Sequence, residues 1–73
     1  MPKLPVLSGR QVVRAFKEAD WRRDRQRGSH VVMLQQGSNV SLSIPQHRAV
    51  APGTLRALIR LSGMTVNEFR QLL

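Results

Sequence analysis

A chain of 73 residues has room for one small domain, and a domain of this size buries only about 60% of the surface that its unfolded chain exposes. No apolar run approaches the roughly 20 residues of a membrane span, and the lack of cysteine excludes disulfides and thiolate metal sites. Twelve basic residues face four acidic ones, which gives a formal net charge of +8 and favours a polyanionic partner over a neutral one.

A helix is predicted from about residue 9. Ser8 and Gln11 have the spacing of a capping box, and Leu7 and Val12 stand where a hydrophobic staple would close over it. Val12 and Phe16, one turn apart, place apolar groups on one face of this helix. The first element is therefore amphipathic and packs against whatever follows.

Three strands are predicted next. Residues 21–26 form a weak strand, Gly28 marks a turn, and residues 29–35 form a β-rich segment. Residues 37–39 have the composition of a hairpin loop. Residues 40–44 alternate apolar side chains with serine, the clearest period-two pattern in the chain, which indicates a strand with one buried face.

Two helices are predicted to complete the fold. Pro52 opens the first, and Gly63 is its natural end. Thr65 and Glu68 form a second capping box, so a short last helix is expected to run to the C-terminus at Leu73. The order α-β-β-β-α-α predicts an α+β fold, a three-stranded antiparallel sheet with helices packed on one face.

The segment Gly28-Ser29-His30 places a histidine at a turn directly after two arginines, Arg25 and Arg27. Histidine side chains titrate near neutral pH and can move a proton, while guanidinium groups hold phosphate and stabilise charge that develops on it. Strand alternation places His30 on the open face of the sheet if residues 40–44 face the helices. The reverse register would bury the histidine. This alternative is not excluded by the sequence, because both faces of residues 30–34 are apolar apart from His30.

Other polar residues near this turn are weaker candidates for a catalytic role. Ser29 is expected to support the turn or bind phosphate, because the adjacent His30 would point to the opposite face of the strand and could not activate it. If their loop folds back over the sheet, His47 with Arg48 could form the second half of an acid-base pair with His30. A histidine exposed to solvent in a loop is the simpler interpretation. On the open face, Val32 and Leu34 would form an exposed apolar patch of the kind that binds partners.

Metal and cofactor chemistry is not expected. Two histidines and four scattered carboxylates offer no ligand set for zinc or magnesium, and no glycine-rich nucleotide loop of standard spacing occurs. The first twenty residues also lack the features of a secretory signal, so a cytoplasmic location is expected.

Four segments of the chain together resemble the HicA family of bacterial toxins. They are residues 3–10, residues 25–30, residues 52–56 and residues 61–69, which occur in the order and at the spacing of the family. The resemblance covers nearly the whole chain, so residues 1–73 are interpreted as a single HicA-like domain.

The resemblance implies a fold related to the double-stranded RNA-binding domain, an endoribonuclease that cleaves mRNA and arrests translation, and neutralisation by a HicB-type antitoxin. It also implies that activity depends on the histidine after Gly28-Ser29, here His30. Family members often carry a second polar group directly after that histidine, whereas this chain has Val31, which argues against a mechanism that needs two adjacent imidazoles.

A mechanism without metal follows as a hypothesis, in which His30 removes the proton from a ribose 2′-hydroxyl that then attacks the neighbouring phosphorus. The residues expected to bind RNA are Arg22, Arg23, Arg25, Arg27, Ser29 and Arg48. Those expected to meet the antitoxin are His30, Val32 and Leu34.

Two other functions are consistent with the same architecture. The first is a non-catalytic binder of structured RNA, but double-stranded RNA-binding domains usually carry a lysine cluster at the start of the last long helix, where residues 52–56 hold one basic residue. The second is a DNA-binding accessory protein, for which the chain lacks a defensible helix-turn-helix spacing.

Overall fold

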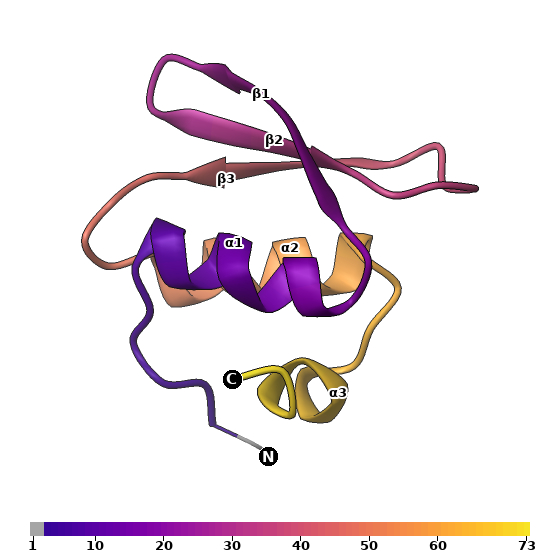
Figure 1. The fold of residues 1–73 in the computed structure, drawn as a ribbon. Helices are drawn as coiled ribbons and strands as arrows, with labels where there is room; N and C mark the ends of the chain where they lie inside the picture. Colours follow the sequence, from indigo (N-terminus) through magenta and orange to yellow (C-terminus); the bar gives the residue numbers. More distant parts are fainter. Residues whose placement is uncertain (1–2) are drawn as a thin grey trace.

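The elements follow one another in the predicted order. A computed structural model describes residues 3–73. The elements are α1 (Gly9–Glu18), β1 (Arg22–Arg27), β2 (His30–Leu34), β3 (Ser41–Pro45), α2 (Pro52–Leu61) and α3 (Val66–Arg70). The strands form an antiparallel sheet in the order β1-β2-β3, and α1 and α2 pack beneath one face of it with α3 beyond them (Figure 1). This α+β arrangement, like that of double-stranded RNA-binding domains, confirms the predicted fold class.

Both predicted capping boxes are present and set where α1 and α3 begin. The Gln11 N–H donates to the Ser8 hydroxyl at 3.1 Å, and the Ser8 N–H donates to the Gln11 side chain at 2.9 Å. At α3 the Thr65 N–H donates to the Glu68 carboxylate at 2.8 Å, while the Thr65 hydroxyl accepts from the Glu68 N–H at 3.1 Å. The backbone bond from Thr65 is the main reason that the pKa of Glu68 is lowered.

The last helix is shorter than predicted. It ends at Arg70, because the amides of residues 71–73 donate to carbonyls three residues back instead of four, which closes a tight turn. The capping box located the start of α3 correctly, but no stop residue marks its end in the sequence.

The sheet turns one face toward the helices, as the alternation in residues 40–44 predicted. Leu42 and Ile44 of β3 are fully buried, and their partners Met33 and Val31 in β2 are buried in the same core. Phe16 of α1 lies at the centre of this core, where its ring packs 6.2 Å from that of Trp21 and 5.1 Å from that of Phe69 (centroid distances). The predicted register is thus confirmed, and His30 lies on the other face.

The start of α1 packs directly on the end of β3. The Gly9 N–H donates to the His47 carbonyl at 2.9 Å, and Gly9 is buried. A Cβ atom on this residue would lie 2.2 Å from the Pro45 carbonyl oxygen and 2.7 Å from the Gln46 Cα atom, both of which belong to the backbone. Only glycine allows this approach, which fixes α1 beside the end of the sheet that carries His30.

Candidate functional site

A β-bulge at Asp24 distributes the arginines of β1 over both faces of the sheet. The pairing shifts between Arg23 and Arg25, so Asp24 is the extra residue. The arginines of β1 pair with β2 as follows: Arg22 with Leu34, Arg23 with Met33, Arg25 with Val32 and Arg27 with His30. Paired residues share a face, so Arg25 and Arg27 lie beside the histidine on the open face, whereas Arg23 lies on the helix side with Met33.

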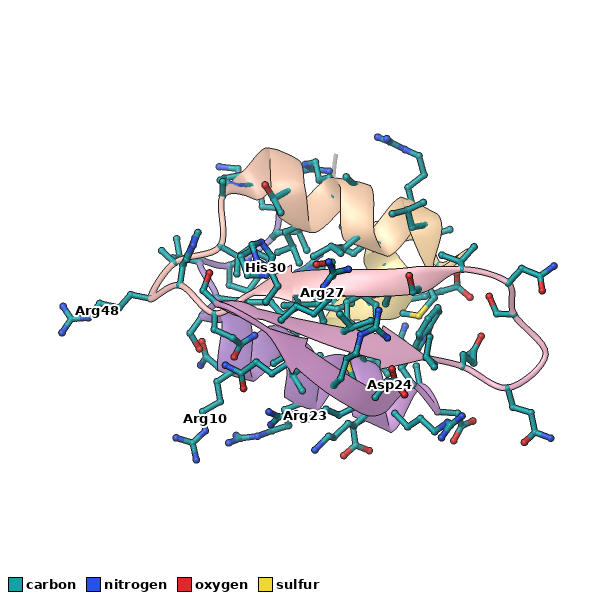
Figure 2. The ribbon with its side chains drawn as sticks, turned by 90° about the horizontal axis from the view of Figure 1, so that it is seen from above. Arg10, Arg23, Asp24, Arg27, His30 and Arg48 are labelled. Carbon is teal, nitrogen blue, oxygen red and sulfur yellow. The ribbon has the colours of Figure 1, made fainter. Side chains whose placement is uncertain are left out.

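His30 is held in place by its backbone while its ring faces solvent. It is the first residue of β2, opposite Arg27 on one side and Pro45 on the other. Its side chain is exposed, and Figure 2 shows it next to Arg27 on the open face. Within residues 3–73 no hydrogen bond engages its imidazole. Both ring nitrogens are therefore free to exchange a proton with a ligand.

The turn before the histidine is shaped by a glycine and tied by two hydrogen bonds. Gly28 and Ser29 form a two-residue connection between β1 and β2, and Gly28 has a φ of 57°, which favours glycine. The Ser29 carbonyl accepts a hydrogen bond from the Gln46 N–H at 2.7 Å, and the Gly28 carbonyl accepts one from the Gln26 side chain at 3.1 Å. The Ser29 backbone thus ties the turn to the segment after β3, while the role expected of its side chain stays a prediction.

The open face carries a shallow hollow of about 540 Å³ beside His30. The lining of this hollow contains the imidazole of His30, the guanidinium groups of Arg25 and Arg27, and the hydroxyl groups of Ser41 and Ser43. Such a set combines a group that moves protons with donors that bind an oxyanion. The hollow is thus suited to a phosphate ester.

Arg25 has a partner that the sequence did not indicate. Its guanidinium forms an ion pair with Asp24 at 2.6 Å, and the two side chains are 54% and 33% exposed. Exposed pairs of this kind contribute about 0–1 kcal/mol, so a phosphate could displace Asp24 at little cost. Arg27 carries no such pair within the described residues and is the more available cation.

The expectation of an exposed apolar patch is wrong for Val32, which is only 5% exposed. It lies outside the main core cluster but between its register partners Arg25 and Ser43, on the floor of the hollow. Long arginine side chains cover neighbouring apolar surface with their methylene stems, an effect that strand alternation alone does not predict. Leu34 is half-buried, so the open face is mainly polar.

The remaining residues expected to bind RNA lie apart from His30. Arg22 pairs with Leu34 at the far end of β2, about 13 Å away along the strand at the usual rise per residue. Arg48 extends from the loop after β3, past the end of the sheet in Figure 2. The structure therefore gathers Arg25 and Arg27 with the histidine around one hollow. Arg22 lies at the other end of the strand pair, Arg23 on the other face, and Arg48 outside the hollow, beyond the end of the sheet that carries His30.

The side chain of His47 is exposed, and its backbone carbonyl accepts the hydrogen bond from the Gly9 N–H at the start of α1. Within residues 3–73 no group of three or more histidine, aspartate or glutamate side chains is arranged to hold a metal ion. In the same range no helix has the length and apolar character needed to cross a membrane.

The family model for the HicA toxin of bacterial toxin-antitoxin systems matches residues 9–64, from the start of α1 to the residue after Gly63. The chain belongs to the HicA toxin family. It is therefore the toxin of a toxin-antitoxin pair and has an antitoxin as its partner. No curated protein and no solved structure shows significant similarity to the chain.

Proposed function

We propose that this HicA family member is an endoribonuclease that cleaves mRNA in the cytoplasm without a metal ion and thereby arrests translation. The observation that carries the proposal is the exposed imidazole of His30 directly opposite Arg27 at a hollow lined by guanidinium and hydroxyl groups. Proton transfer and anion binding at one place are what cleavage of a phosphodiester by its own ribose hydroxyl requires.

In the proposed reaction, a nitrogen of His30 takes the proton from the 2′-hydroxyl of the nucleotide before the cleaved bond. The 2′-oxygen forms a bond to phosphorus, and the bond from phosphorus to the 5′-oxygen of the next nucleotide breaks. The leaving oxygen takes a proton from water, and the hydroxide that remains takes the proton held by His30, which restores the neutral imidazole. The products are a 2′,3′-cyclic phosphate and a 5′-hydroxyl. Arg27, and Arg25 after release from Asp24, hold the phosphate oxygens while negative charge accumulates on them.

Incubating the purified wild-type chain with single-stranded RNA in excess EDTA tests this proposal. We expect fragments that end in a 2′,3′-cyclic phosphate, because the reaction uses only protein groups and the ribose hydroxyl. The main alternative, a non-catalytic RNA-binding module, would shift the RNA in a gel and leave it intact. Cleavage that appears only when a divalent ion is added would contradict the metal-free mechanism.

We further propose that the antitoxin is of the HicB type and inhibits the toxin by covering His30. An acidic surface would complement the net charge of +8, and Leu34, half-buried on the open face, would supply an apolar contact. Because Val32 is buried, Leu34 is the better position for a test that leaves the fold intact.

Leu34→Glu should weaken binding of the HicB-type antitoxin at least about tenfold, since it places a charge in a contact that loses its water. Titration calorimetry with both purified proteins would measure the change. Leu61→Glu is the matched control, because Leu61 is 54% exposed at the end of α2 in the helical layer. Equal affinities for the two variants would place the antitoxin on another face.

A further inference from the structure

A second basic groove lies on the other side of β1, between this strand and α1. It has a volume of about 300 Å³, and four cations line it: Arg10, Arg14, Lys17 and Arg23. The first three follow one another at intervals of four and three residues, so they share one face of α1. The bulge at Asp24 brings Arg23 to the same side of the sheet, and Figure 2 shows Arg23 and Arg10 along this edge, away from Arg27 and His30.

The charge of this groove is largely uncompensated by the protein. The one ion pair within residues 3–73 joins Arg25 to Asp24 and involves none of the four groove cations. Glu18 follows Arg14 by four residues without forming an ion pair to it, and Arg23 donates to the neutral Gln26 side chain at 2.7 Å. Like charges this close repel one another and destabilise the free protein. An anionic ligand bound in the groove would reduce this repulsion.

The groove also meets the His30 turn directly. Gln46, part of its lining, follows Pro45, the register partner of His30, and its N–H donates to the Ser29 carbonyl at 2.7 Å. Its side-chain nitrogen donates to the Ile44 carbonyl at 3.1 Å, which leaves the amide oxygen as an acceptor for another donor, such as a ribose hydroxyl. An RNA strand in the groove would thus run toward the histidine.

We propose that this α1/β1 groove binds the phosphate backbone of the RNA substrate to one side of the cleaved bond, so that the strand crosses the β1 edge between the two sets of cations. This inference rests on the proposed nuclease function. β1 lies at the edge of the sheet and all six of its residues are exposed, so nothing among the described residues blocks that path. The floor of the groove, Val13 and Val31, is buried and offers little apolar surface to a protein partner.

The test uses the full chain with His30→Ala, which the proposed mechanism expects to leave bound RNA largely uncut, and a gel of the RNA after each titration checks that it is intact. Arg14→Gln/Lys17→Gln should weaken binding of a long single-stranded RNA at least about tenfold and reduce the slope of log K against log salt by about 1.4, the value for two lost phosphate contacts. Arg60→Gln/Arg70→Gln removes the same charge from exposed positions on α2 and α3 and should change affinity little, because salt screens distant charges. Fluorescence anisotropy of a labelled RNA at several salt concentrations measures the affinity and the salt slope of both variants.

Two results would overturn the assignment of the groove to RNA. They are unchanged RNA affinity in the groove variant and an equal loss of affinity in the control variant. The nuclease proposal fails separately, if the unmodified chain leaves RNA uncut, so the two failures are distinguishable.

Discussion

His30→Ala should lower the rate of RNA cleavage by about 10² to 10⁴-fold, the usual contribution of a positioned acid or base, while leaving the fold intact. The side chain is exposed and takes no part in the buried core, so its loss removes no packing. Arg27 and Arg25 remain in the variant, which should therefore still bind RNA with nearly unchanged affinity. Single-turnover cleavage of a labelled RNA and a thermal melt together measure both expectations.

His47→Ala is the matched control for this experiment. His47 is also exposed and lies close to the same end of the sheet, and the hydrogen bond that it accepts from Gly9 uses its backbone carbonyl, which alanine retains. Its cleavage rate should stay within a few-fold of the wild type. Cleavage by His30→Ala at the wild-type rate would remove the imidazole from the mechanism.

Gly9→Ala should destabilise the domain by about 1–3 kcal/mol, the usual cost of forcing an extra methyl group into a packed site. The added Cβ would lie 2.2 Å from the Pro45 carbonyl oxygen, and the backbone cannot swing away as a flexible side chain would. Relief requires α1 to move off the end of β3, which would also stretch the Gly9 to His47 hydrogen bond. Chemical denaturation followed by circular dichroism measures the change in the free energy of unfolding.

Gly53→Ala in α2 separates this steric effect from a general effect of replacing glycine in a helix. A Cβ at Gly53 meets nothing within 4 Å, and alanine restricts the unfolded chain, so this variant should be stabilised by about 0.4–1 kcal/mol. If Gly9→Ala were as stable as the wild type, the close approach of α1 to β3 would not be a constraint on the fold.

The sequence predicted the features that local rules decide. Two capping boxes located the starts of α1 and α3, and the alternation of apolar and serine residues in β3 identified its buried face. That pattern favoured His30 on the open side but left the reverse register of residues 30–34 open, because both of their faces are apolar. The pairing of Val31 with Ile44 and of Met33 with Leu42 decides between the two.

The features that the sequence did not predict depend on neighbouring strands. A run of polar residues in β1 contains nothing that marks Asp24 as a bulge, yet the bulge decides that Arg23 belongs to a different groove from Arg25. Val32 is buried between its register partners Arg25 in β1 and Ser43 in β3, and the sequence of its own strand does not predict this burial. The Gly28-Ser29-His30 turn beside Arg25 and Arg27 and the resemblance to the HicA family both indicated His30, but neither gave a guide to the groove beside α1.

The most direct test of the proposed mechanism is a pair of synthetic RNAs that differ at one atom. Once the cleavage site is mapped, the wild-type chain is incubated in EDTA with the natural RNA and with the same RNA lacking the 2′-hydroxyl before the cleaved bond. The mechanism predicts cleavage of the first to a 2′,3′-cyclic phosphate and no cleavage of the second at that bond. Equal cleavage of both would show that the ribose hydroxyl is not the nucleophile and would contradict the role given to His30.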